Sequence, residues 1–167
     1  DPEGSCHTGI NYLTIYRGIP KSQINMGVPF WGLEFNATEI NGSFTGDIKD
    51  VRYTEIPSLI GNGWTRKWDE DALVPYLVND EKTKILTYDD PESMRLKSEY
   101  VIERELGGMM IWALGYDQTN NGQELIRSIK RNYLSVESEP INSGPLQFSI
   151  KSYPNPFNSS LKIQIDV

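Results

Sequence analysis

Two short apolar runs stand out in the hydrophobic pattern of the chain. They read QINMGVPFWG at residues 23–32 and GGMMIWALGYD at residues 107–117. Continuous apolar runs of this length are typical of strands buried on both faces, and such strands occur mainly in parallel sheets. We therefore predict two buried strands, one within residues 23–32 and one over residues 108–114.

The segment before the second run carries the start and stop signals of a helix. Asp90 suits the N-cap, Pro91 the first helical position and Glu92 the first turn, where its charge complements the helix dipole. Gly107 supplies a C-terminal stop. We predict a helix over residues 91–106 that leads directly into the second strand.

Two further segments, residues 9–18 and 123–134, place apolar side chains at helical spacing. These side chains are Tyr12, Leu13 and Tyr16 in the first segment and Ile126, Ile129 and Tyr133 in the second. Gly18 ends the first of these helices, and Pro20 prevents its continuation. One helix is thus predicted before the first apolar strand and another after the second.

The pattern changes between the two strands. Over residues 34–88 the segments are short, are separated by Gly and Asn turns, and alternate between apolar and polar positions. This pattern predicts a small antiparallel sheet, inserted between the first strand and the second helix.

Without this insertion, the predicted order is helix, strand, helix, strand, helix. Repeated units of this kind indicate an α/β fold in which helices cover a parallel sheet. Two strands cannot complete such a sheet, so we expect most of it to lie outside this chain. After residue 133, residues 134–146 have the composition of a linker, and residues 147–167 alternate like the first strands of a truncated β-sandwich.

Composition restricts the ligand class. The chain carries 23 acidic and 16 basic residues, for a formal charge of -7. Nucleic acids and anionic membranes favour clustered Lys and Arg, so we expect a neutral or polar partner instead. No apolar run approaches the roughly 18 residues of a membrane span.

Cysteine and histidine each occur once, as Cys6 and His7. One cysteine excludes a disulfide within the chain, and the two residues together are too few for a zinc site built from several Cys and His ligands. We predict no metal and no cofactor. We interpret the Cys6–His7 pair as an incidental surface pair, because adjacent side chains generally point in different directions.

Three motifs in order resemble one family. GIPKSQINMGVPFWG, VRYTEI with YDDPESMRLKSEY, and LGGMMIWALGYD are similar to the C-terminal part of a family 18 glycoside hydrolase, the chitinase family, over about residues 9–133. The resemblance implies the last two strands of a TIM barrel with a small α+β insertion. It also implies chitin or N-acetylglucosamine oligosaccharides as ligands.

The tail resembles a different module. SYPNPFN is similar to the opening of the C-terminal sorting domain on cargo of the bacterial type IX secretion system. This resemblance implies that the secretion machinery is a partner. It also implies a bacterial protein that is secreted or displayed at the cell surface.

The family resemblance assigns substrate-binding residues. Trp112 matches the tryptophan that forms the hydrophobic floor under the sugar at the cleavage point, where an indole face can stack on a pyranose. Met110 matches a position that lines the same pocket, although core packing explains it nearly as well. Trp31 matches the usual aromatic residue at the exit of the preceding strand, whereas Leu33 stands where the family commonly has arginine.

Tyr53 and Glu55 match an insertion motif whose side chains reach over the cleft toward substrate. Residues two apart in a strand point to the same face, so a strand there would place both side chains on one cleft wall. A solvated strand face is the alternative interpretation.

Family 18 chemistry uses the N-acetyl carbonyl of the substrate as nucleophile and one glutamate as general acid and base. That glutamate ends a D-x-x-D-x-D-x-E motif, and no segment of this chain has the spacing. We therefore expect no catalytic residue in this chain and no hydrolysis by it alone, and we expect the motif upstream of Asp1. The alternatives for the parent protein are a chitinase-like lectin and an endo-N-acetylglucosaminidase.

Overall fold

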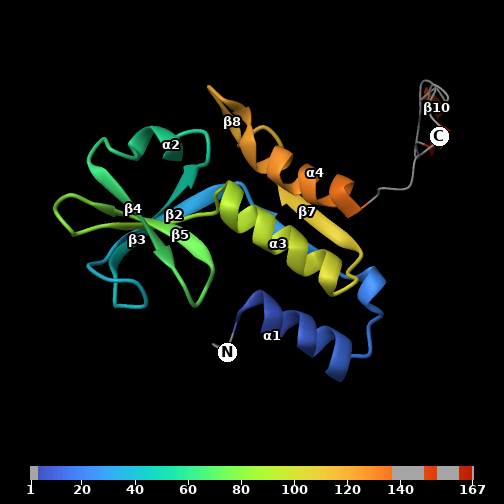
Figure 1. Ribbon diagram of the computed structural model, residues 1–167, viewed down its shortest axis with the longest axis horizontal. Coiled ribbons are helices and arrows are strands. Elements are labelled where there is room, and N and C mark those ends of the chain that lie inside the picture. Colours follow the sequence, from blue (N-terminus) through green and yellow to red (C-terminus); the bar gives the residue numbers. More distant parts are fainter. Residues whose placement is uncertain (1–3, 137–148, 154–161, 167) are drawn as a thin grey trace. The chain divides into compact units, whose positions relative to one another are not determined.

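The computed structural model describes residues 4–136, 149–153 and 162–166 (Figure 1). The chain divides into two units at residue 136, and each is described by itself. The helical elements of the first unit are α1 (Cys6–Asn11), a π-helical turn (Tyr12–Tyr16), a 3₁₀ turn (Lys21–Gln23), α2 (Ile56–Leu59), α3 (Pro91–Glu103) and α4 (Glu124–Val136). Its strands are β1 (Asn25–Pro29), β2 (Trp31–Asn36), β3 (Thr45–Arg52), β4 (Trp64–Asp69), β5 (Val74–Asn79), β6 (Ile85–Thr87), β7 (Gly108–Trp112), β8 (Gln118–Thr119) and β9 (Gly122–Gln123).

The two predicted apolar strands pair in parallel, as expected. β1 and β7 run side by side from Asn25 opposite Gly108 to Pro29 opposite Trp112. The prediction that both faces of these strands are buried was wrong for this chain. Met26 and Val28 are buried on one face, whereas Met110 and Trp112 on the other face are 51% and 63% exposed. The reason is that helices cover only one face of the pair.

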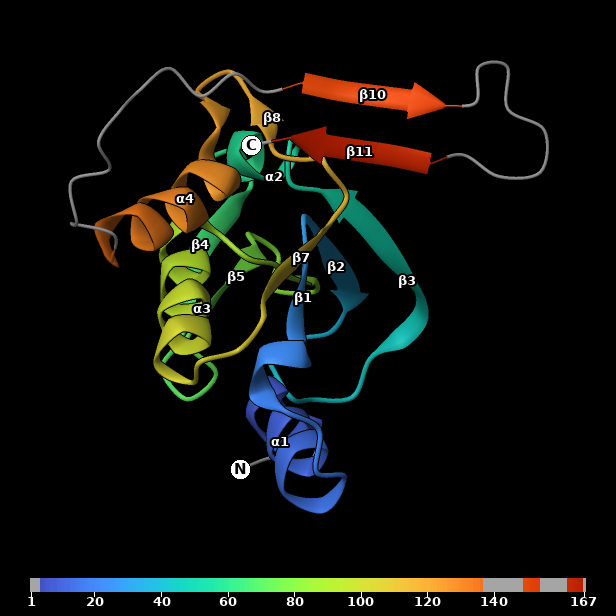
Figure 2. The same cartoon turned by 90° about the vertical axis from the view of Figure 1, so that its right-hand side faces the viewer.

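Helices α3 and α4 form that cover (Figure 2). The Ser128 hydroxyl of α4 donates to the carbonyl oxygen of Pro91 over 2.6 Å, which fixes the two helices against each other. The buried face of α4 is carried by Leu125 and Ile129, while Ile126 is only partly buried. The predicted stripe is confirmed at Ile126 and Ile129, which both pack against the core, and Leu125 adds a buried position that was not predicted.

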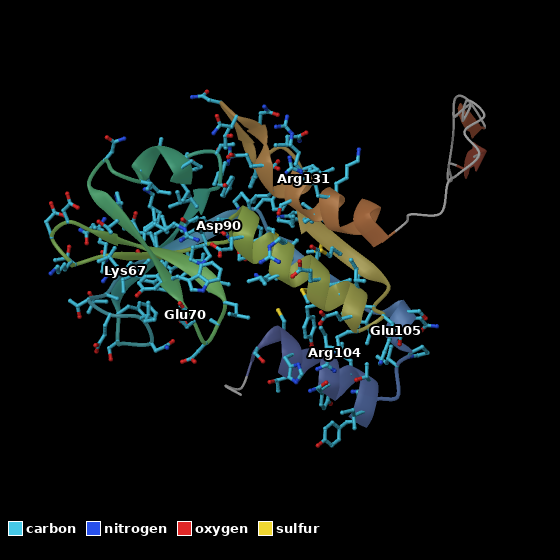
Figure 3. All side chains as sticks on the ribbon, in the orientation of Figure 1. Lys67, Glu70, Asp90, Arg104, Glu105 and Arg131 are labelled. Carbon is cyan, nitrogen blue, oxygen red and sulfur yellow. The ribbon has the colours of Figure 1, made fainter. Side chains whose placement is uncertain are left out.

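The predicted N-terminus of α3 is confirmed. Asp90 is the N-cap, and its carboxylate accepts from the backbone N–H groups of Glu92 and Ser93, both over 3.0 Å. The predicted stop at Gly107 was wrong, because α3 ends at Glu103 and Glu105 adopts the left-handed conformation with φ of 56°. Glu105 and Asp90 thus mark opposite ends of the helix (Figure 3).

The first helix begins earlier than predicted. α1 starts at Cys6, with the Ser5 side chain accepting from the backbone N–H of Thr8, and Gly18 follows the helical segment with φ of 65°. His7 is not an incidental surface residue. Its Nδ1 lies 2.9 Å from both Tyr100 Oη and Arg104 Nη2 of α3, and since a guanidinium only donates, this nitrogen accepts.

The predicted antiparallel insertion is confirmed as a five-stranded sheet of order β3-β2-β6-β5-β4. Leu77 and Leu86 lie opposite each other in neighbouring strands and are both fully buried. β2 already begins at Trp31, so the insertion starts three residues before the predicted residue 34. The chain passes from β1 into the insertion through Phe30, which is also fully buried.

The second unit contains β10 (Ser149–Tyr153) and β11 (Lys162–Asp166), which pair antiparallel. Two alternating strands were predicted here. The proline-rich turn between them lies outside the described residues, as does most of the predicted linker, of which residues 134–136 belong to α4. Within the described parts of the chain, no helix is long and apolar enough to cross a membrane.

Candidate functional site

The carboxyl ends of β1 and β7 meet the insertion at one point. The backbone N–H of Phe30, just past β1, donates to the carbonyl oxygen of Trp112 over 2.8 Å, and the N–H of Tyr53 donates to the carbonyl oxygen of Phe30 over 3.0 Å. Ligands of parallel α/β sheets bind at this end of the strands. The candidate site is therefore built around the exits of β1, β7 and β3.

Trp112 and Met110 share the exposed face of β7. Residues two apart in a strand point to the same side, and these two side chains remain more than half exposed. Met110 is paired with Gly27 of β1, and its side chain packs against this glycine: a β-carbon added at Gly27 would be 3.3 Å from Met110 Cε. This face therefore presents an indole and a thioether that are each more than half exposed.

Trp31 extends the site onto the insertion sheet. It is half-buried and lies directly opposite Arg52 in the β2–β3 pair. Leu33 lies opposite Asp50 on the same face. The Arg52 guanidinium carbon is 4.6 Å from the centroid of the Tyr116 ring, in the segment that follows β7. Arg52 and Tyr116 were not among the residues predicted from the sequence, because their proximity depends on the fold.

The expected strand placement of Tyr53 and Glu55 was wrong. β3 ends at Arg52, and residues 53–55 form a turn in which the N–H of Glu55 donates to the carbonyl oxygen of Arg52 over 3.0 Å. The side chains are therefore not on one face. Tyr53 is only 4% exposed and belongs to the core, whereas Glu55 is exposed at the start of α2.

A buried polar cluster lies behind these residues. It consists of Tyr53, Tyr88 and Asp117, which are 4%, 7% and 0% exposed. Burial, together with the charges of Glu124 and Asp90, raises the pKa of Tyr53 well above its ordinary value. Burial and the charge of Asp90 raise the pKa of Tyr88 to about 12, while nearby Arg66 acts in the opposite direction.

Two atoms of this cluster have no hydrogen-bond partner among the described residues, namely Tyr88 Oη and Asp117 Oδ1. The other oxygen of Asp117 accepts from the backbone N–H of Ile126 over 3.2 Å. Asp117 therefore connects the segment after β7 to the first turn of α4. In the sequence, Asp117 is visible only as the aspartate at the end of the second apolar run, and that position does not predict its burial.

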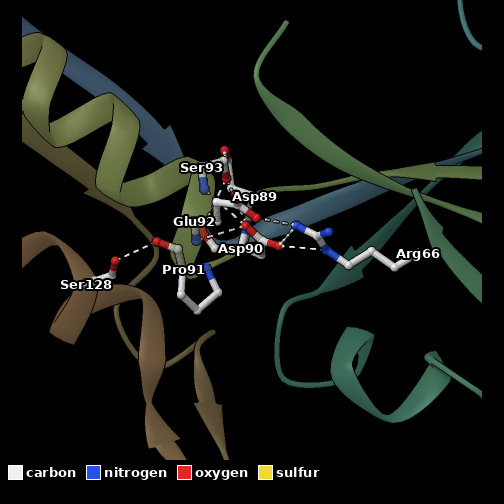
Figure 4. A network of polar contacts seen from close by, with 7 residues as sticks. All are labelled: Arg66, Asp89, Asp90, Pro91, Glu92, Ser93 and Ser128. Carbon is white, nitrogen blue, oxygen red and sulfur yellow. Dashed lines mark hydrogen bonds and ion pairs between the residues drawn. The ribbon is translucent and has the colours of Figure 1, made fainter. Parts of the chain in front are cut away.

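An ion-pair network holds the insertion against α3 (Figure 4). Arg66 of β4 donates to Asp90 Oδ2 through Nε over 3.0 Å and through Nη2 over 2.7 Å, and Nη2 also lies 2.9 Å from Glu92 Oε2. Asp89 accepts from Ser93 and from Lys97. Asp90 and Glu92 were interpreted as residues that start the helix, and their contacts agree with that structural role.

The site is an open face in the described residues. A pocket of about 350 Å³ does occur in the insertion, between residues 37–44 and β5, but none of the five predicted binding residues lines it. No group of three or more His, Cys, Asp or Glu side chains within the described ranges could hold a metal ion.

Residues 3–117 match the profile of the family described as Glycosyl hydrolases family 18. This match spans more than half of the chain, so the chain belongs to family 18. Chitinase A1 from Niallia circulans is 31% identical over 125 residues, which cover 66% of this chain but 18% of that protein. The chain thus spans only a small part of the length of this curated relative.

Solved structures agree with this family. A family 18 N-acetylglucosaminidase from Paenibacillus barengoltzii superposes with a TM-score of 0.64 and 28% identity, covering 77% of this chain and 40% of that one. Human YKL-39, a pseudo-chitinase with retained chitooligosaccharide binding, gives a TM-score of 0.63 and 25% identity over 76% of this chain and 39% of that one. These neighbours are family 18 proteins with the α/β TIM-barrel fold.

Proposed function

We propose that this chain is the C-terminal portion of the barrel of a secreted, chitin-degrading family 18 glycoside hydrolase. In this role it contributes the floor and one wall of a cleft for β-1,4-linked N-acetylglucosamine units. The observation that carries the proposal is the exposed indole of Trp112, 63% exposed at the carboxyl end of β7, with Met110 beside it. The relatives supporting it include chitinases.

The exposed face of β1 and β7 supports the barrel part of the proposal. An uncovered apolar sheet face with two open edges is unfavourable in water. The remaining strands of a TIM barrel would cover it, because barrel interiors are filled by inward-facing side chains. The chain covers only 18% of Chitinase A1 and 40% of the N-acetylglucosaminidase, which supports the interpretation that further barrel strands belong to the parent protein.

The proposed chemistry is substrate-assisted and retains the anomeric configuration. The N-acetyl carbonyl oxygen of the substrate attacks the anomeric carbon as the leaving oxygen takes a proton from a glutamate, which later removes a proton from water. No segment of this sequence has the D-x-x-D-x-D-x-E spacing that supplies this glutamate. In this proposal the chain binds and orients the sugar, and it does not hydrolyse it alone.

Within this proposal, Trp112 stacks on the sugar ring, Met110 contacts the N-acetyl methyl, and Trp31 lines the wall. The exposed carboxylate of Glu55 is available to accept a hydrogen bond from a sugar hydroxyl. Tyr53 contributes by packing behind the wall, because its ring is buried.

The alternative function is carbohydrate binding without hydrolysis. It is favoured by the similarity to YKL-39, a pseudo-chitinase that retains chitooligosaccharide binding. Both functions predict that the chain binds sugar through Trp112. They differ only in whether the parent protein cleaves it.

The test has two arms. The first is titration of the 167-residue chain with an N-acetylglucosamine tetrasaccharide, for which we expect binding that Trp112→Ala weakens at least about tenfold. The second is incubation with a chromogenic chitobiose derivative, for which we expect no turnover. Lack of binding by a chain whose circular dichroism shows it to be folded would overturn the site, and turnover by this chain would overturn its assignment as a binding portion only.

We further propose that the tail directs the protein out of a bacterial cell through type IX secretion. The support is the SYPNPFN sequence, followed by alternating residues. The full-length parent protein should be exported by a bacterium that has this system and retained by a mutant that lacks it. Equal export from both strains would remove this part of the proposal.

A further inference from the structure

We propose that Arg52 is a sugar-binding residue, whose guanidinium donates hydrogen bonds to oxygen atoms of a bound N-acetylglucosamine oligosaccharide. This inference rests on the proposed function, because it adds a contact to the same site. It is carried by the position of Arg52, by side-chain donors that no described residue engages, and by its aromatic neighbours.

Position is the first argument. Arg52 is the last residue of β3 and lies opposite Trp31 in the antiparallel β2–β3 pair. Directly opposed residues of such a pair point to the same face of the sheet. Arg52 therefore leaves the sheet on the side of Trp31, while the next residue, Tyr53, turns into the core.

The end of β3 also lies beside the segment that follows Trp112 (Figure 2). The backbone N–H of Thr54 donates to the carbonyl oxygen of Tyr116 over 2.8 Å. This hydrogen bond fixes the exit of β3 next to the exit of β7. Arg52 thus lies next to Trp31 of the insertion on one side and next to Tyr116, in the segment that follows β7, on the other.

The second argument concerns the guanidinium itself. It is exposed and lies over the ring of Tyr116, 4.6 Å from its centroid, and within the described residues no hydrogen bond or ion pair engages it. This cation–π contact engages the face of the ring and offers the guanidinium N–H groups no oxygen or nitrogen acceptor, so it leaves their hydrogen-bonding capacity unused. By contrast, Arg66 binds two carboxylates and has no such role.

The third argument is the chemistry of the neighbourhood. Exposed Trp112 and half-buried Trp31 suit the apolar faces of pyranose rings, whose rims carry many oxygen acceptors. Leu33 and Asp50, the next opposed pair on the face of Arg52, provide no side-chain donor. Arg52 supplies the donor that such a ligand requires there.

The test is calorimetric titration of the 167-residue chain and its variants with an N-acetylglucosamine tetrasaccharide. We expect Arg52→Ala to raise the Kd about tenfold, as for loss of a hydrogen bond to a charged group. Arg52→Lys should weaken binding less, because it keeps a charged donor but loses the planar stacking group. The control is Lys49→Ala, which removes a positive charge from the opposite face of β3 and should leave the Kd within about twofold.

The outcomes separate this inference from the proposed function. Suppose that the unaltered chain binds the sugar and that Trp112→Ala weakens binding, but that the Kd of Arg52→Ala equals that of Lys49→Ala. The role of Arg52 is then overturned, and the site around Trp112 stands. If the unaltered chain does not bind, both are overturned. Circular dichroism and thermal unfolding of Arg52→Ala should match those of the unaltered chain. If Arg52→Ala is destabilised but Arg52→Lys restores binding, direct contact between residue 52 and the sugar is still supported.

Discussion

Phe30 and Trp112 are joined by a backbone hydrogen bond of 2.8 Å, yet their side chains lie in opposite environments. Phe30, which links β1 to the insertion sheet, is fully buried, whereas Trp112 is 63% exposed. One hydrogen bond therefore links a residue that stabilises the fold to a residue that is available for a ligand. This difference makes stability and binding separable by substitution.

We predict that Phe30→Ala lowers the free energy of unfolding by about 3–5 kcal/mol, because it removes a large buried aromatic side chain. Trp112→Ala should change it by less than about 1 kcal/mol, because most of the indole already faces solvent. Urea denaturation measures both. A large loss of stability in Trp112→Ala would mean that the indole packs in the core and would weaken its assignment to the site.

Asp117 provides a second test of how the segment after β7 is held. Asp117→Ala removes the acceptor for the Ile126 N–H and should lower the free energy of unfolding by about 1–3 kcal/mol. Asp117→Asn retains an oxygen acceptor and should cost less. Asp71→Ala serves as the control, since Asp71 is exposed, and we expect a change within about 0.5 kcal/mol.

The parallel strands, the inserted antiparallel sheet and the start of α3 were predictable because each depends on local sequence. A continuous apolar run, an alternating pattern and an Asp-Pro pair specify their structures without distant partners. The burial of β7 was not predictable in the same way. Whether Met110 and Trp112 are covered depends on which other elements pack on that face.

The candidate site shows the same division. Trp112 and Met110 were assigned through the family resemblance of one motif, and β7 places them on the same face. Tyr53 and Glu55 were expected in a strand, but the turn closed by the hydrogen bond from the N–H of Glu55 to the carbonyl oxygen of Arg52 ends β3 before them. The cation–π contact of Arg52 with Tyr116 joins positions far apart in sequence, so no local pattern predicts it.

The Arg66–Asp90 pair yields a third prediction. Arg66→Ala leaves the largely buried Asp90 carboxylate without its countercharge and should lower the free energy of unfolding by about 2–3 kcal/mol. Glu92→Ala removes only the more exposed partner and should cost less than about 1 kcal/mol. Equal effects in urea denaturation would contradict the view that the Asp90 contact holds the insertion against α3.

The C-terminus of α3 yields a prediction of increased stability. Glu105 has φ of 56°, and its N–H donates to the carbonyl oxygen of Ile102 over 3.0 Å, while the N–H of Leu106 donates to that of Val101 over 3.0 Å. These two bonds define a helix end at which glycine is favoured. Glu105→Gly should therefore stabilise the chain by about 0.5–1 kcal/mol. Glu103→Gly, the same change within the helix, should destabilise it by a similar amount, and thermal unfolding distinguishes the two signs.

Alkaline pH should destabilise the chain through its buried tyrosines. Tyr88 has a pKa raised from 10.0 to about 12 by burial and by the charge of Asp90, so the folded state retains its proton at a pH where the unfolded state releases it. A raised pKa gives stability that is fully present below pH 10 and is lost as the pH rises toward 12. At about 1.4 kcal/mol per pKa unit, Tyr88 contributes about 2–3 kcal/mol to this loss. Tyr53 acts in the same direction.

The control is Tyr88→Phe, which removes the titrating group. Because Tyr88 Oη is buried without a hydrogen-bond partner in the described residues, this variant should be as stable as the unaltered chain at neutral pH, or more stable. Above pH 10 it should lose less stability in urea denaturation. If both proteins lose stability equally between pH 10 and 12, Tyr88 is not a source of the alkaline sensitivity, and Tyr53 is left as the candidate.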